Sequence, residues 1–168
     1  MSVTDNDMLI ERFELGRDGA IPNNPRLPVL IYHGVIGRGG DPARSFERLF
    51  RRNGWTNSWR DGMYGFHHFH STAHEVLGIA GGWVRARIGG TGGHVFDLGT
   101  GDVVLLPAGT GHKCESASVD LLIVGAYAEG REWDLRRGAP EEWDDVLENI
   151  RLLPDPERDP VTGEPFKE

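Results

Sequence analysis

Between residues 55 and 127 the sequence consists of short apolar runs separated by paired glycines. Glycine accepts the positive φ angles that tight turns require. Residues 83–88 alternate between apolar and polar side chains, whereas 102–106 and 120–124 are nearly continuous apolar runs. Segments this short, with no helical pattern between them, are typical of antiparallel strands. The region therefore predicts an all-β fold, a barrel or a sandwich.

Two helices are predicted outside this region. Asp41 is a favourable N-cap before Pro42, and apolar residues at helical spacing follow, which predicts a helix over 42–52. Pro140 favours the start of a second helix over 140–150, where the apolar residues share one face.

The 168 residues suit one structural domain. We divide it into four parts. Residues 1–54 form an N-terminal arm, a strand at 28–32 and the first helix, all packing on the barrel. Residues 55–130 form the β-barrel core, and 131–153 contain the C-terminal helix. Residues 154–168 carry four prolines among charged residues, which predicts a loosely ordered tail.

Composition excludes several classes of function. The net charge of −8, without a long basic run, argues against nucleic-acid binding. No apolar stretch is long enough to span a membrane, and the first residues lack a secretion signal pattern. A lone cysteine, Cys114, fits a reducing compartment, so we expect a cytoplasmic protein.

Four of the seven histidines lie in one short segment, 67–74. On a strand, His68 and His70 point to the same face, while His67 points to the other. A turn after His70 would allow a return strand beginning at Glu75 to place its carboxylate beside the two imidazoles. These donors suit iron, manganese, nickel, copper or zinc. The alternative is a polar strand whose histidines only form hydrogen bonds.

A further histidine, His112, follows a buried strand and a Pro-x-Gly turn. With it, the sequence resembles the two motifs of the cupin superfamily. The first motif is matched by Gly62, His68, His70, Glu75 and Gly82, and the second by Gly101, Pro107, Gly109 and His112. Ser116 stands where the second motif has asparagine.

The resemblance covers about residues 55–127 and implies a cupin-type double-stranded β-helix, also called a jelly-roll barrel. We expect an N-terminal arm and one or two flanking helices as additions to this barrel. The resemblance also implies that His68, His70, Glu75 and His112 hold one divalent transition metal, which could be iron, manganese, zinc or nickel. The chain looks similar to single-domain bacterial cupins without an assigned reaction.

Several further residues are candidates for a place near the metal or the substrate. His67 is interpreted first as a packed histidine, and His74 as a residue outside the ligand set or on the surface. Cys114 should point to the same side as His112, although a buried thiol is usually structural. Arg85 and Arg87 share a face that either clamps a substrate carboxylate or is solvated. Tyr64 could line the rim of a pocket.

The favoured hypothesis is a metal-dependent enzyme acting on a small organic molecule, by dioxygenase or decarboxylase chemistry. The resemblance implies this breadth and does not narrow it. The alternative is a non-catalytic module that binds a metal or a small ligand, and another is an interaction protein with a structural metal. We expect a homodimer, because the N-terminal arm could add a strand to a partner sheet.

Overall fold

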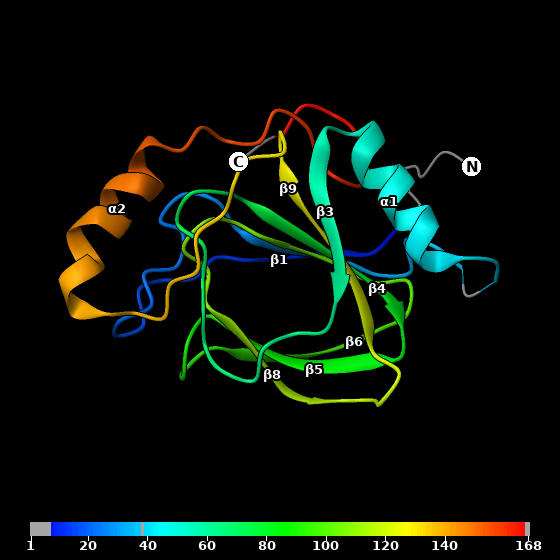
Figure 1. Cartoon of the computed structure of the whole chain (residues 1–168), viewed down its shortest axis with the longest axis horizontal. Coiled ribbons are helices and arrows are strands. Elements are labelled where there is room, and N and C mark those ends of the chain that lie inside the picture. The colour runs from blue at the N-terminus through cyan, green and yellow to red at the C-terminus, as the bar shows by residue number, and fades with distance from the viewer. Residues whose placement is uncertain (1–7, 38, 167–168) are drawn as a thin grey trace.

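The computed structural model describes residues 8–37 and 39–166, and within them the strands form two antiparallel sheets (Figure 1). The larger sheet has the strand order β1-β2-β7-β4-β9-β3, and the smaller has the order β6-β5-β8. In chain order the strands are β1 (Ile10–Phe13), β2 (Val29–Tyr32), β3 (Trp55–Asp61), β4 (Glu75–Gly81), β5 (Trp83–Ile88), β6 (His94–Gly99), β7 (Val103–Leu106), β8 (His112–Ala117) and β9 (Leu122–Ala128). The helices are α1 (Pro42–Arg52), the short 3-10 helix η2 (Pro140–Glu142) and α2 (Trp143–Leu152).

The larger sheet is buried on both faces. Along β4, Leu77 and Ile79 join the core between the two sheets, whereas Val76 and Ala80 join the core under α1. Because side chains alternate along a strand, the first residue of β4, Glu75, falls on the same side as Leu77. This alternation directs a carboxylate into the interior of the barrel.

The smaller sheet shows the opposite arrangement, with one face buried and one exposed. Val84, Ala86 and Ile88 of β5 are buried against the core, while Trp83 and Arg85 are exposed. The two sheets thus enclose the apolar interior of a jelly-roll barrel, and the predicted cupin-type all-β fold is confirmed. No helix in the described part of the chain has the length and apolar character needed to span a membrane.

Helix α1 begins where the sequence predicts, and Asp41 caps it by accepting a hydrogen bond from the Arg44 amide at 3.1 Å. Its Phe46 ring lies directly on Gly78 of β4, where an added Cβ would stand 2.7 Å from the ring. The second predicted helix begins as the η2 turn and continues as α2, two residues beyond the expected end. Its buried Ile150 packs in a third cluster with Phe69.

The C-terminal segment differs from the predicted loose tail. The Trp55 indole nitrogen donates a hydrogen bond to the Arg158 carbonyl at 2.9 Å. The side-chain amide of Asn53 donates one to the Pro160 carbonyl at 2.7 Å. Val161 is buried in the core under α1. The prediction was wrong because proline limits helix and strand formation but does not prevent a segment from packing.

The N-terminal arm pairs within its own chain, with β1 antiparallel to β2. It therefore completes the edge of the larger sheet here, and the homodimer remains a prediction. Residues 1–7 of the predicted arm and residues 167–168 of the predicted tail lie outside the described residues.

The contact between α1 and β4 predicts the effect of a small substitution. Gly78→Ala should lower the free energy of unfolding by about 1–3 kcal/mol, because the new methyl group would press against the Phe46 ring. Gly99→Ala is the matched control, since a Cβ there meets nothing within 4 Å. Urea denaturation of both variants measures the difference, and equal stabilities would contradict this packing.

Candidate metal centre

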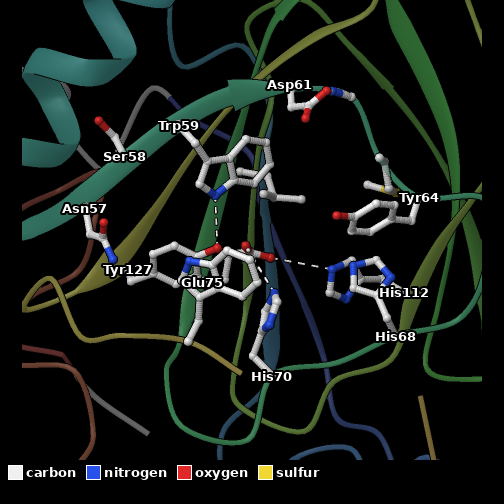
Figure 2. Close-up of a pocket in the computed structure, with 14 residues that line it drawn as sticks. Asn57, Ser58, Trp59, Asp61, Tyr64, His68, His70, Glu75, His112 and Tyr127 are labelled. Atoms are coloured by element: carbon white, nitrogen blue, oxygen red, sulfur yellow. Dashed lines mark hydrogen bonds and ion pairs between the residues drawn. The ribbon is translucent and has the colours of Figure 1, made fainter. Parts of the chain in front are cut away.

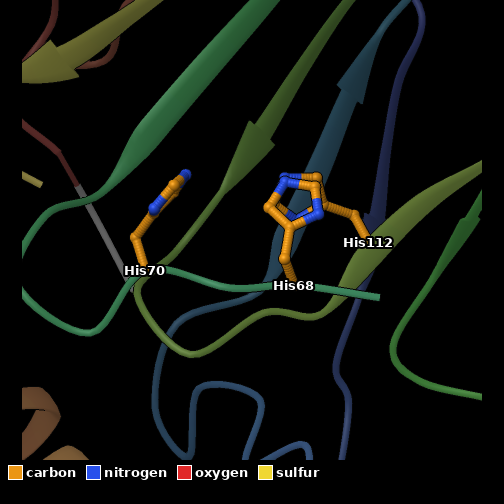
Figure 3. Close-up of side chains that lie close together, drawn as sticks. All are labelled: His68, His70 and His112. Carbon is orange, nitrogen blue, oxygen red and sulfur yellow. The ribbon is translucent and has the colours of Figure 1, made fainter. Parts of the chain in front are cut away.

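Three histidines from two segments meet at one end of the barrel (Figure 3). His68 and His70 lie before β4, and His112 is the first residue of β8. A pair of backbone hydrogen bonds joins the segments: the His68 amide donates to the His112 carbonyl at 3.2 Å, and the reverse bond measures 3.0 Å. One nitrogen from each of the three rings lies within 4.8 Å of the other two.

The carboxylate of Glu75 completes the cluster (Figure 2). One carboxylate oxygen lies 3.4 Å from Nε2 of His70, and the other lies 3.5 Å from Nε2 of His112. All four side chains are buried. Four donor groups from three parts of the chain therefore face one another in the interior.

Backbone carbonyls orient all three imidazoles. Nδ1 of His68 lies 3.1 Å from the Phe66 carbonyl, and Nδ1 of His112 lies 3.0 Å from the Thr110 carbonyl. Nδ1 of His70 is close to the Asp134 carbonyl. A carbonyl only accepts, so each Nδ1 must carry the proton and donate it. That tautomer leaves the lone pair on Nε2, the atom that faces the cluster in His70 and His112.

The environment keeps His68 and Glu75 in states suited to metal binding. Burial and, to a smaller extent, nearby His112 lower the pKa of His68 to about 3, so the ring is neutral at neutral pH. Burial alone would raise the pKa of Glu75, but the adjacent His70 and His112 rings outweigh it and lower that pKa. The result is an ionised carboxylate beside imidazole nitrogen donors.

Asp134 holds the loop that carries His70. Its carboxylate accepts hydrogen bonds from the amides of Ser71 and Thr72 at 2.6 and 3.2 Å, from both hydroxyls, and from Arg136 at 2.8 Å. Its own carbonyl accepts from the His70 ring. Asp134 therefore fixes both the loop and the ring of His70. The sequence motifs did not point to it, because it lies about sixty positions away from its partners.

The cluster forms the base of a cavity of about 510 Å³. Aromatic side chains make up much of its wall: Trp59, Tyr64, Tyr127 and Trp133. The Trp59 indole nitrogen donates to the Tyr127 hydroxyl at 2.9 Å (Figure 2). Burial and the charge of Glu75 raise the pKa of Tyr127, so this hydroxyl keeps its proton.

The two arginines on β5 do not face the cavity. Arg85 pairs with Asp97 at 2.8 Å, and Arg87 pairs with Glu115 at 2.6 Å, both on the outer face of the smaller sheet. The interpretation that these arginines clamp a substrate carboxylate was therefore wrong. Their positions fit the alternative, in which they lie on a solvated face. The buried residues that alternate with them, Val84 and Ala86, fix the parity that the glycine pair at 81–82 left open.

The other candidates take varied positions. Tyr64 lines the cavity, with its ring stacked on Phe66 at 4.8 Å. His67 is outside the cavity lining, and neither of its ring nitrogens has a hydrogen-bond partner among the described residues. Cys114 packs against the core between the sheets and does not line the cavity, and burial raises the pKa of its thiol.

His74 is buried, so the surface interpretation was wrong. Its Nδ1 accepts a hydrogen bond from the Ala108 amide at 3.0 Å, and its Nε2 lies 3.0 Å from the Pro154 carbonyl. Burial lowers the pKa of His74 to about 4, which keeps the ring neutral for both contacts. This histidine joins the turn before β8 to the C-terminal segment.

Fold and site together give the chain a cupin-type jelly-roll barrel with a buried cluster of three histidines. No protein-family model matches it. "Uncharacterized protein YjlB" of Bacillus subtilis (strain 168) is 37% identical over 146 residues, covering 87% of this chain and 86% of that protein. The chain belongs to the same family as this Bacillus protein.

Solved structures resemble the chain more distantly. An oxalate decarboxylase from Bacillus subtilis is 18% identical with a TM-score of 0.41, and the match covers 76% of this chain and 34% of that chain. An acireductone dioxygenase from Bacillus anthracis, with a cadmium ion in its active centre, is 16% identical with a TM-score of 0.40, covering 76% and 82%. Procruciferin, an 11S globulin from Brassica napus, has a TM-score of 0.39, is 14% identical, and is covered over 30% of its length, against 76% of this chain. Similarity at this level does not extend to activity or ligands.

Because Asp134 orients His70, its removal should weaken metal binding. Asp134→Ala should weaken the binding of Mn²⁺ or Co²⁺ by about ten- to a hundredfold, because residues that orient a ligand contribute that much to affinity. Titration calorimetry measures the affinity, and thermal unfolding without metal shows whether the variant still folds.

Asp97→Ala is the matched control, since Asp97 is an exposed carboxylate that also pairs with an arginine. It should bind the metal as the unchanged protein does. Equal affinities for the Asp134 and Asp97 variants would contradict the positioning role.

Proposed function

We propose that the chain is a metal-dependent cupin enzyme acting on a small organic molecule, with one divalent transition metal held by His68, His70, Glu75 and His112. The observation that carries the proposal is a cluster of three oriented imidazoles, two of which lie 3.4 and 3.5 Å from a buried, ionised carboxylate. Without an ion, such a carboxylate would be costly to bury for no structural gain.

The spacing of the donors fits a single ion. Ligand atoms about 2.1 Å from a metal lie about 3 Å apart when they are neighbours in its coordination shell, and about 4.2 Å apart across it. The separations of 3.4 and 3.5 Å between Glu75 and two of the rings are close to the first value. Small side-chain movements would complete the shell. The donor set suits iron, manganese, zinc or nickel.

The cavity favours a catalytic or ligand-binding centre over a purely structural one. Structural metal sites are usually closed by their ligands, whereas this cluster lies at the base of an open cavity. When bound, the metal would act as a Lewis acid with positions left for a substrate. The chain itself supplies the aromatic wall that orients a substrate and excludes water.

Dioxygenase- and decarboxylase-type chemistry are the two reaction classes that we favour. A non-catalytic binding module is the second candidate, because the same donors and cavity could retain a metal-bound ligand without changing it. A homodimer and a cytoplasmic location stay predictions.

Metal analysis tests the centre directly. Protein purified without chelator or nickel resin should contain about one transition-metal ion per chain. His112→Ala and Glu75→Gln should each lower the affinity by at least about a hundredfold, because the first removes a ligand atom and the second replaces a charged ligand oxygen by a neutral amide.

His67→Ala is the matched control, because His67 is a neighbouring histidine outside the cavity lining. It should keep the metal. If it loses as much affinity as His112→Ala while all variants stay folded, the assigned ligands are wrong.

Turnover separates the enzyme from the binding module. The iron- or manganese-loaded protein is incubated with a panel of small acids and diols while dioxygen consumption and carbon dioxide release are recorded. We expect turnover of at least one compound, abolished in Glu75→Gln. Metal-dependent binding without turnover across the panel would favour the module.

A further inference from the structure

We propose that the cavity takes an uncharged organic molecule that carries a flat ring, and that it disfavours dicarboxylates. The inference rests on the proposed function, because it names the substrate class of the same site. Three features of the cavity carry it: the charges on its wall, the positions of the neighbouring arginines, and the arrangement of its aromatic side chains.

The wall offers no cation to a dicarboxylate. Neither lysine nor arginine occurs among the lining residues that the structure describes. Apart from Glu75, the charged residue in the lining is Asp61, which stands at the rim (Figure 2). A metal could pair with one carboxylate of a substrate, but the second would enter an aromatic cavity unpaired. Burying an unpaired charge is strongly unfavourable.

Arginines on neighbouring segments have partners elsewhere. Arg60 of β3 pairs with Glu47 of α1 at 2.6 Å, and Arg136 contacts Asp134 and Glu142. The Arg137 guanidinium lies over the Phe66 ring, 3.9 Å from its centroid. Recruiting one of them for a substrate carboxylate would break an existing contact.

The aromatic wall is held in place before any substrate binds. Trp59 lies directly on Gly125 of β9, where an added Cβ would stand 2.2 Å from the indole ring. The rings of Tyr127 and Trp133 stack at 5.9 Å with an interplanar angle of 20°. Trp133 is nevertheless 42% exposed and Tyr64 is 51% exposed, so both keep ring surface free.

Rigid aromatic surfaces around a cavity favour flat apolar molecules, because ring stacking adds to the burial of apolar area and little side-chain freedom is lost. The rim also carries the polar residues Asn57 and Ser58. These groups can form hydrogen bonds with hydroxyl substituents without requiring a charge. An uncharged hydroxylated ring can therefore stack on the aromatic side chains and form hydrogen bonds with the polar rim. A dicarboxylate can pair only with the metal.

A matched pair of probes isolates the charge. Catechol and phthalate carry the same benzene ring, with two adjacent hydroxyls in one and two adjacent carboxylates in the other, and catechol is uncharged at neutral pH. Oxalate is the dicarboxylate without a ring. Titration calorimetry is run on both the manganese-loaded and the metal-free protein, because catechol releases a proton when it binds a metal. In both forms catechol should bind at least about tenfold more tightly than either dicarboxylate.

Two variants test the wall. Trp133→Leu should weaken catechol binding about three- to tenfold, which is the size expected for the loss of one aromatic contact. Trp83→Leu is the matched control, because Trp83 is similarly exposed at 48% but lies on β5, outside the cavity lining. Asp61→Asn should strengthen phthalate binding more than catechol binding, because it removes a negative charge from the rim.

The inference is overturned if phthalate or oxalate binds as tightly as catechol, or if Trp133→Leu behaves like Trp83→Leu. Manganese binding is measured first on the same sample. Failure to bind any of iron, manganese, zinc and nickel refutes the proposed function, and the comparison of catechol with phthalate on the metal-free protein then still decides this inference.

Discussion

The alternation of side chains along β4 determines which of its residues face the barrel interior and which face α1. Glu75, Leu77 and Ile79 point into the barrel, whereas Val76 and Gly78 face α1. A slip of one residue would bring the carboxylate under the helix and the glycine into the interior. The packing of Phe46 on Gly78 therefore fixes the register that keeps Glu75 among the histidines. Stability of the core and geometry of the site depend on one strand.

Burial of the Glu75 carboxylate then determines which groups must lie next to it. An ionised group this deep must be paired, and the nitrogens of His70 and His112 stand at hydrogen-bonding or ligand distance from it. The three rings are in turn oriented by backbone carbonyls, and a side-chain substitution does not remove a backbone carbonyl. The donor atoms are consequently arranged by the fold before a metal binds, which reduces the cost of binding.

The sequence predicted what depends on local spacing. The cupin fold, the helix at 42–52 and the segments that bring the histidines together follow from motifs and periodicity within short stretches. The outward direction of Arg85 did not, because the bend at Gly81-Gly82 hides the parity of β5. The roles of Asp134 and Trp133 did not either, since both contact His70, about sixty positions away. The prolines of the C-terminal segment indicated looseness, although its contacts with Trp55 are tertiary and leave no local signal.

One segment links the metal centre to the aromatic wall. Asp134 orients His70 and holds its loop, and the preceding residue, Trp133, stacks on Tyr127 and meets the His70 ring edge-on at 5.2 Å. Helix α2 supports the same loop, because the side-chain amide of Asn149 donates a hydrogen bond to the Ser71 hydroxyl at 3.1 Å. A change in this segment would therefore alter the substrate wall and the metal geometry together while both cupin motifs stayed intact. Motifs alone can thus identify the fold and the donor set, but the proposed function depends also on a part of the chain that they do not include.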